Sequence, residues 1–144
     1  MDSVDYDPEQ LIEAYFERGW TDGLPVVPPT EKSIAAMLAG AALRGDETIG
    51  EIAERGVVVS AEKLAINAVM AGCRPEYLPV VVAAVRGLCH PHFAYHGPAS
   101  STGGSAMVLI VNGPIAGRIG VNSGNNVFGQ GCGPTPPSGA RCGS

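Results

Sequence analysis

The chain has 144 residues, a formal net charge of −5 and a hydrophobic content of 45%. This length fits one domain, and the apolar fraction is sufficient for a real hydrophobic core. The nine Lys and Arg residues are scattered along the sequence and form no basic stripe, so DNA and RNA are not expected partners.

The N-terminal residues 1–10 (MDSVDYDPEQ) are acidic and polar, unlike a secretory signal or an amphipathic transit peptide. The longest apolar run, YLPVVVAAVRGLC, is broken by Pro79 and Arg86 and is shorter than the ~18 residues that span a bilayer. We therefore expect a soluble cytoplasmic protein with no membrane partner. Thiols stay reduced in that compartment, so the four cysteines need not form disulfides.

Four helices are predicted from the apolar periodicity, over residues 8–18, 31–41, 61–71 and 75–88. Thr30 and Ser60 are suited to cap the second and third helices, because a hydroxyl oxygen can accept a hydrogen bond from a free amide of the first turn. Gly19 and Gly72 are suited to end the first and third helices. The fourth helix is apolar nearly all round, so we expect it to lie centrally in the core.

Short strands are predicted over residues 24–27 (LPVV), 57–59 (VVV) and 106–113 (AMVLIVNG), the second and third of them buried. The prediction is strongest for 106–113, because a continuous β-branched run is typical of a strand buried on both faces. Residues 45–56 are predicted to be surface. The alternation of helices and short strands predicts an α/β or α+β fold, with helices packed on a small, mostly parallel sheet.

Cys73 is the best candidate for a nucleophile. It precedes the predicted fourth helix, whose free amides and dipole favour an anion, and Arg74 adds a positive charge beside it. Both effects would lower the pKa of the thiol and form the reactive thiolate. The alternative is a small, buried apolar residue in a turn between two helices.

A cysteine and three histidines lie close together in a predicted loop over residues 89–105: Cys89, His90, His92 and His96. Zinc or copper could use such soft ligands, but Pro91 restricts the geometry and no second ligand pair stands at helical spacing. Ordinary loop histidines are the simpler interpretation, so no metal site is assigned. His96 is also a candidate general base, because histidine titrates near neutrality.

Several asparagines lie at or after the end of the strand predicted over 106–113: Asn112, Asn122, Asn125 and Asn126. Ligands of α/β folds bind beyond the carboxyl ends of strands, so these amides could hold an anionic or carbonyl group. The alternative is a series of tight turns that use Asn and Gly for positive φ.

Two further stretches bear on ligand binding. Asp22 lies between Trp20 and the strand predicted over 24–27, and it is either a turn former or a residue that lines a cleft. Residues 101–105 (STGGS) precede a strand instead of a helix, which is the wrong order for a dinucleotide fingerprint. We therefore expect no nucleotide cofactor.

Four segments together resemble a bacterial family, the UGSC-like (seleno)proteins: WTDGLPVVPPT, AINAVMAGCRPEY, LIVNGPI and GVNSGNNVFGQG. Relatives in that family are often described as thiol-disulfide oxidoreductases. The resemblance covers roughly residues 8–131 and implies that residues 1–131 form a single α/β domain, the N-terminal part of a longer family domain. The Cys-Gly-Ser-Cys version of the family's selenocysteine motif has no counterpart in this chain.

The resemblance implies a thiol-based small-molecule enzyme, using redox or covalent cysteine chemistry. Cys73, Arg74 and His96 are then the catalytic candidates. The residues proposed to bind the substrate are Asp22, Asn112, Asn122 and Asn125. The alternative function is a non-catalytic subunit or partner-binding module.

Residues 132–144 (CGPTPPSGARCGS) are expected to form a disordered tail that does not belong to the family domain. Family members continue instead with a helix resembling Arg-Ala-Asn-Ala-Thr-Ile-Gly-Arg-Ala-Leu-Arg-Leu. Codons for residues 133–144, read one base earlier, can encode that helix, which predicts a frameshift near Gly131–Cys132. Cys132 and Cys142 are then accidental. The strand and fourth helix would expose apolar surface, which a second copy or a partner subunit could cover, and the sheet would be incomplete at its C-terminal end.

Overall fold

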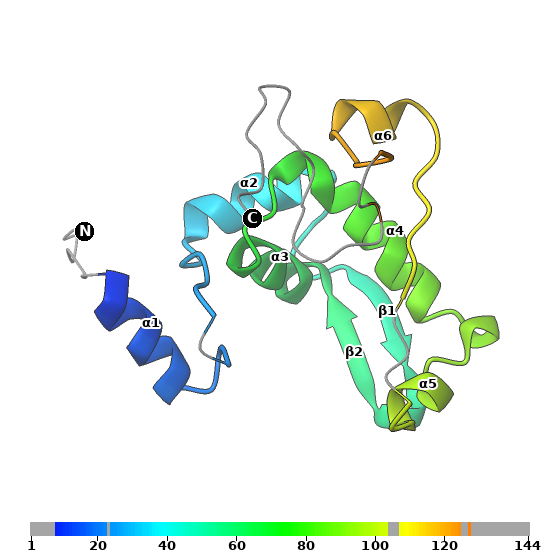
Figure 1. Ribbon diagram of the computed structural model, residues 1–144, viewed down its shortest axis with the longest axis horizontal. Coiled ribbons are helices and arrows are strands. Elements are labelled where there is room, and N and C mark those ends of the chain that lie inside the picture. The colour runs from blue at the N-terminus through cyan, green and yellow to red at the C-terminus, as the bar shows by residue number, and fades with distance from the viewer. Residues whose placement is uncertain (1–7, 23, 104–106, 125–126, 128–144) are drawn as a thin grey trace. The chain divides into compact units, whose positions relative to one another are not determined.

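The computed structural model describes residues 8–22, 24–103, 107–124 and 127 (Figure 1). Its secondary structure consists of six α-helices, three short 3-10 helices and one two-stranded sheet within these residues. The chain divides into two compact units, the first built from residues 1–49 and 58–78 and the second from residues 50–57 and 79–144. The tail predicted over 132–144 lies outside the described residues.

The sheet is an antiparallel hairpin of β1 (Thr48–Ile52) and β2 (Val57–Ser60). The prediction of a mostly parallel sheet is therefore wrong. A parallel pair needs a long crossover connection, whereas these strands are joined by the short helix η1 (Ala53–Arg55) and by Gly56 at a φ of 60°. The prediction of surface for residues 45–56 missed β1, where only Ile49 is fully buried.

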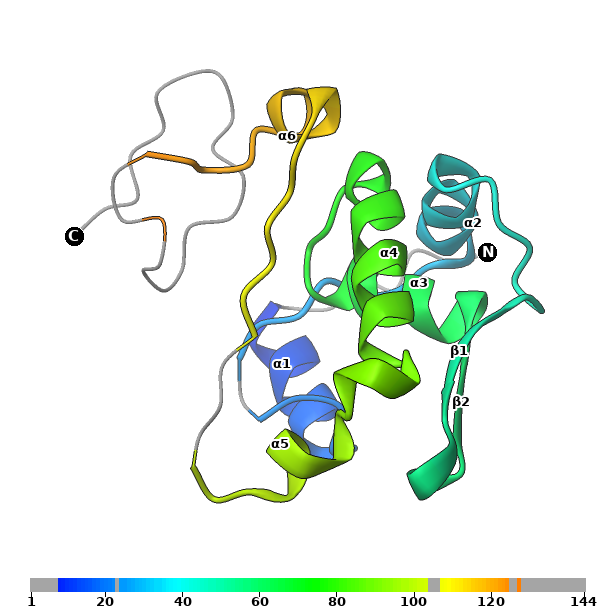
Figure 2. The same ribbon diagram turned by 90° about the vertical axis from the view of Figure 1, so that its right-hand side faces the viewer.

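The first unit contains α1 (Pro8–Glu17), α2 (Glu31–Gly40), α3 (Ala61–Met70) and the 3-10 helix η2 (Pro75–Tyr77). Helix α2 packs against α3 and η2, and Figures 1 and 2 both show α2 and α3 side by side. The buried apolar side chains of this unit are Tyr15, Met37, Ile49, Ala61, Leu64, Ala65, Ala68, Val69 and Leu78. Three of them, Ala61, Ala65 and Ala68, are small residues of α3, which allows a close approach of the neighbouring helix.

The helix caps of the first unit are the predicted ones. The Thr30 hydroxyl accepts a hydrogen bond from the amide of Ser33 at 3.1 Å, and the Ser60 hydroxyl accepts one from the amide of Lys63 at 3.3 Å. Gly72 follows α3 with a φ of 74°, a conformation that costs glycine little. The local signals in the sequence therefore located these helix ends correctly.

The second unit contains the hairpin tip, α4 (Leu78–Leu88) from residue 79 onward, η3 (Pro91–Phe93), α5 (His96–Ser100) and α6 (Pro114–Arg118). The loop predicted over 89–105 thus holds two short helices. Helix α4 was predicted to be central, but Leu78 and Val82 are its buried residues and the others are at least partly exposed. None of the described helices is long and apolar enough to cross a membrane.

Two of the three predicted strands are absent from the described residues. Residues 24–27 are irregular, because Pro25 within the segment and Pro28 directly after it lack the N–H groups that a strand ladder needs. Residues 107–112 are also irregular, and they run beside α4 in Figures 1 and 2. The remaining predicted strand, residues 57–59, corresponds to β2, but Val57 and Val58 are exposed instead of buried.

Candidate functional site

A concave site of the first unit lies between the segment after α1 and the C-terminal end of α3. The amide of Val27 donates a hydrogen bond of 3.0 Å to the carbonyl oxygen of Met70, which fixes the proline-rich segment against the helix. The pocket has a volume of about 510 Å³ and is lined by Trp20, Thr21, Asp22, Leu24, Pro25, Val26, Val27, Asn67, Met70, Ala71 and Gly72. Asp22 therefore does line a cleft, one of its two predicted roles.

Trp20 stands between this pocket and a second hollow. The second hollow has a volume of about 500 Å³ and is lined by Trp20, Pro29, Ile34, Ile66, Asn67 and Met70. Within its own segment, the indole ring lies 5.3 Å from the ring of Tyr15, and the Arg18 guanidinium carbon lies 5.1 Å from the indole centroid. Trp20 is still 52% exposed, so much of this aromatic surface faces the two hollows.

Asp22 also shapes its own turn. Its Oδ1 accepts a hydrogen bond from the amide of Leu24 at 3.4 Å, so the turn-former prediction is supported together with the cleft-lining one. The carboxylate is exposed, which keeps it in reach of a solute in the pocket. Sequence reasoning identified Asp22 but did not identify Asn67 or Met70, which come from the distant helix α3.

Cys73 lies at the end of α3, in a position that disfavours a thiolate. Its amide donates a hydrogen bond to the carbonyl oxygen of Ala68 at 2.9 Å, and the amide of Gly72 donates one to Val69 at 2.8 Å, which together form a Schellman motif. Burial raises the pKa of the Cys73 thiol above its ordinary value of 9.0. This direction is opposite to the lowered pKa that the sequence suggested.

The other two catalytic candidates are not brought into a site with Cys73. Arg74 is the exposed residue that precedes η2, and it makes no side-chain cap there. The backbone of His96 begins α5 in the second unit, and its side chain lies outside the described part of the chain. Cys73 and Arg74 line none of the hollows of the first unit named above.

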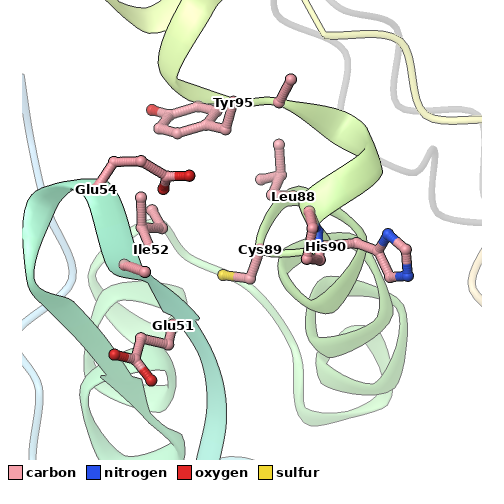
Figure 3. A pocket seen from close by; sticks show the side chains of 10 residues that line it. Glu51, Ile52, Glu54, Leu88, Cys89, His90 and Tyr95 are labelled. Atoms are coloured by element: carbon pink, nitrogen blue, oxygen red, sulfur yellow. The ribbon is translucent and has the colours of Figure 1, made fainter.

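The second unit has a small pocket of about 90 Å³ around Cys89. The pocket is lined by Glu51, Ile52, Ala53, Glu54, Leu88, Cys89, His90, Pro91, Ala94 and Tyr95 (Figure 3). Figure 3 shows the Cys89 sulfur pointing toward the hairpin, while the His90 ring turns away from it. Burial raises the pKa of the Cys89 thiol, so this arrangement is not an activated cysteine–histidine pair.

The predicted histidine cluster is explained by local structure. The Nδ1 atom of His90 accepts a hydrogen bond from the amide of His92 at 3.2 Å, which caps η3, and the two rings lie 4.9 Å apart. Among the described residues, no group of three or more His, Cys, Asp or Glu side chains is arranged to hold a metal ion. The His96 side chain is not among these described residues.

Two of the asparagines predicted to bind substrate, Asn112 and Asn122, lie within the described residues and have different local surroundings. Asn112 lines a hollow beside α4, whereas the Oδ1 atom of Asn122 accepts a hydrogen bond from the amide of Gly124 at 3.0 Å. That contact fits the alternative of a tight turn. Asn125 and Asn126 lie outside the described residues, as do Cys132 and Cys142.

Comparisons of the chain with protein-family models, with curated protein sequences and with solved structures found no match. The resemblance to the UGSC-like family therefore stays a prediction from the four motifs.

Proposed function

We propose that this chain is a non-catalytic subunit that assembles with a second copy of itself through residues 107–111. One observation carries the proposal: four consecutive apolar side chains, Met107, Val108, Leu109 and Ile110, are 58%, 65%, 64% and 81% exposed. Burying such a side chain contributes about 1.5–3 kcal/mol, so covering this run would be a strong driving force for association.

Within the described part of the chain, the backbone of the same segment is also available for pairing. Among the described residues, no backbone hydrogen bond joins Met107–Val111 to another part of the chain. An extended segment with unpaired amides and carbonyls is a template for a strand from another molecule. The high β-propensity of MVLIV, which predicted a strand, is consistent with a strand that forms only on pairing.

The segment also leaves apolar space next to it. A hollow of about 410 Å³ lies between this segment and α4, and its lining includes Val80, Ala83, Leu109 and Ile115. Side chains of a second copy could fill part of this space when the strands pair. Residues 107–111 would then have both a hydrogen-bonding partner and an apolar one.

Self-pairing fits the sequence of the segment. If two copies pair antiparallel about Leu109, Met107 faces Val111 of the second copy and Val108 faces Ile110, so every cross-strand pair is apolar. No Asp, Glu, Lys or Arg lies between Arg86 and Arg118, so the approach meets no local charge repulsion. A five-residue pairing is small beside a standard interface, so we expect a dissociation constant on the order of micromolar.

Thiol chemistry, which the family resemblance implies, has less support from the geometry. Burial raises the pKa of both Cys73 and Cys89, and a reactive thiol requires the opposite shift. The assembly proposal needs no activated side chain.

Sedimentation velocity over a range of protein concentrations tests the proposal. The wild-type chain should pass from monomer to dimer, whereas Leu109→Lys should stay monomeric because its charge would be buried in the pair. Leu24→Lys is the matched control, since Leu24 is 67% exposed and lies in the first unit. A wild-type chain that stays monomeric at ~100 μM, two orders above the expected dissociation constant, would overturn the proposal.

A further inference from the structure

The pocket beside Trp20 has the composition of a small-molecule site. Its volume of about 510 Å³ lies within the range of ~300–1,000 Å³ that is typical of ligand pockets. Most of its lining is apolar, from Leu24, Val26, Val27 and Met70, and a few polar groups stand among these side chains. It belongs entirely to the first unit, so it is independent of the proposed pairing through residues 107–111.

The charge in this pocket is negative. Among the described residues that line it, Asp22 is the one with a charged side chain. Met70, Ala71 and Gly72 also line it, and they form the C-terminal end of α3, where the helix dipole places partial negative charge. A cationic group would be attracted by both, whereas an anion would be repelled.

Trp20 supplies an aromatic surface on which the apolar body of such a ligand can lie. The Arg18 guanidinium lies 5.1 Å from the indole centroid and already takes up the cation-binding capacity of the ring, so the ammonium group is assigned to Asp22. Arg18 is not among the lining residues, so the pocket remains open to a ligand while Arg18 covers part of the ring. The thioether of Met70 is an adaptable apolar contact that suits an aromatic or aliphatic body.

We infer that this pocket binds a small organic amine, whose ammonium group pairs with the Asp22 carboxylate and whose apolar body lies against Trp20 and Met70. Asp22 provides the charge, and the apolar lining provides the contact area. The side-chain amide of Asn67 donates a hydrogen bond to the carbonyl oxygen of Lys63 at 2.8 Å, which holds this side chain against its own helix at the pocket wall.

The fluorescence of Trp20 reports on this pocket directly, because the chain has a single tryptophan. Three probes of similar size separate charge from shape: phenethylamine is a cation at neutral pH, 2-phenylethanol is neutral and 3-phenylpropionate is an anion. We expect a saturable fluorescence change with phenethylamine. The dissociation constant for phenethylamine should be about tenfold lower than that for 2-phenylethanol. The reason is that a hydrogen bond between the ammonium group and the carboxylate is stronger than one from a neutral hydroxyl.

Asp22→Asn is the decisive variant. It keeps the oxygen that accepts from Leu24 but removes the charge, so it should weaken phenethylamine about tenfold and leave 2-phenylethanol unchanged. Asp46→Asn is the matched control, because Asp46 is an exposed aspartate paired with Arg44 at 3.1 Å and does not line the pocket. Leu109→Lys should bind the amine normally, which separates this inference from the assembly proposal.

Three results would overturn the inference. The first is no saturable response to phenethylamine, and the second is equal binding of the neutral or anionic probe. The third is an Asp22→Asn variant that binds the amine as tightly as the wild-type chain does. Circular dichroism of each variant checks that the helices are intact in these comparisons.

Discussion

Gly40, the last residue of α2, lies so close to Pro75 that a β-carbon built on it would fall 2.5 Å from the Pro75 carbonyl oxygen. Real β-carbons essentially never approach backbone oxygen atoms this closely. The contact is the point at which α2 packs against η2, so only glycine at position 40 allows the first unit to close in this way.

Gly40→Ala should therefore destabilise the chain, although replacing glycine by alanine in a helix normally stabilises it. We expect a loss of about 1–3 kcal/mol in the free energy of unfolding, because overpacking forces the backbone to shift. Urea denaturation followed by circular dichroism measures this. Gly87→Ala is the control, since Gly87 lies in α4 with open space around it and should gain up to ~1 kcal/mol.

The two helix caps should each contribute measurably to stability. Thr30→Ala and Ser60→Ala remove hydroxyl groups that accept from the amides of Ser33 and Lys63, so each should cost about 1 kcal/mol. Thr102→Ala, an exposed threonine outside any helix, serves as the control. Equal stability of all three variants would show that the caps contribute nothing.

The cysteines should react slowly and in a strongly pH-dependent manner. Because burial raises the pKa of Cys73 and Cys89, the thiolate fraction near neutral pH is below that of a free cysteine. In variants that keep Cys73 or Cys89 as the single cysteine, with the other three of the four cysteines replaced by alanine, the rate of alkylation by iodoacetamide should rise about tenfold per pH unit between pH 6 and 8. A rate that is the same at pH 6 and pH 8 would instead restore Cys73 as a catalytic candidate.

The same shifts make the stability of the chain depend on pH. A thiol whose pKa is higher in the folded state stabilises the fold fully below the pKa of the unfolded chain and loses that contribution as the pH rises through the folded value. The free energy of unfolding should therefore fall above pH 9.0, the ordinary thiol pKa. In the double variant Cys73→Ala and Cys89→Ala, the free energy of unfolding should fall less over the same pH range. Identical pH profiles of the two chains would show that these thiols do not cause the fall.

Local signals in the sequence predicted the four longer helices well, but they did not predict the short helices α5 and α6. The caps at Thr30 and Ser60 and the glycine after α3 are short-range features, and their hydrogen bonds join residues three to five positions apart. Such contacts form whatever the rest of the chain does. The predicted helix ends therefore agree with the structure to within a few residues.

The sheet could not be predicted in the same way, because strand pairing needs a partner segment that the composition of a strand does not identify. The MVLIV run has the composition of a buried strand, yet no described segment pairs with it. The β1 strand carries Gly50 and Glu51 and looked like surface, yet it pairs with β2. Composition reports what a strand needs, but not whether a partner is present.

The candidate site was predicted only in part, because some of its residues are far apart in the sequence. The cleft-lining role of Asp22 was one of two interpretations that its place beside Trp20 in the sequence allowed. Met70 and Asn67 join the pocket only because the Val27 amide binds the Met70 carbonyl oxygen. The low pKa expected for Cys73 failed because burial and the end of α3 outweigh the start of the next helix.

Cross-linking at position 109 tests the assembly proposal most directly. In a chain whose native cysteines are replaced by alanine, Leu109→Cys should form an intermolecular disulfide on mild oxidation. An antiparallel pair centred on Leu109 places the two α-carbons about 4.5–5.5 Å apart, within the disulfide range. Met107→Cys alone should not cross-link, because its copy lies about 14 Å away along the strand. Equal cross-linking at 107, 109 and the exposed control Leu24→Cys would contradict the proposed pairing.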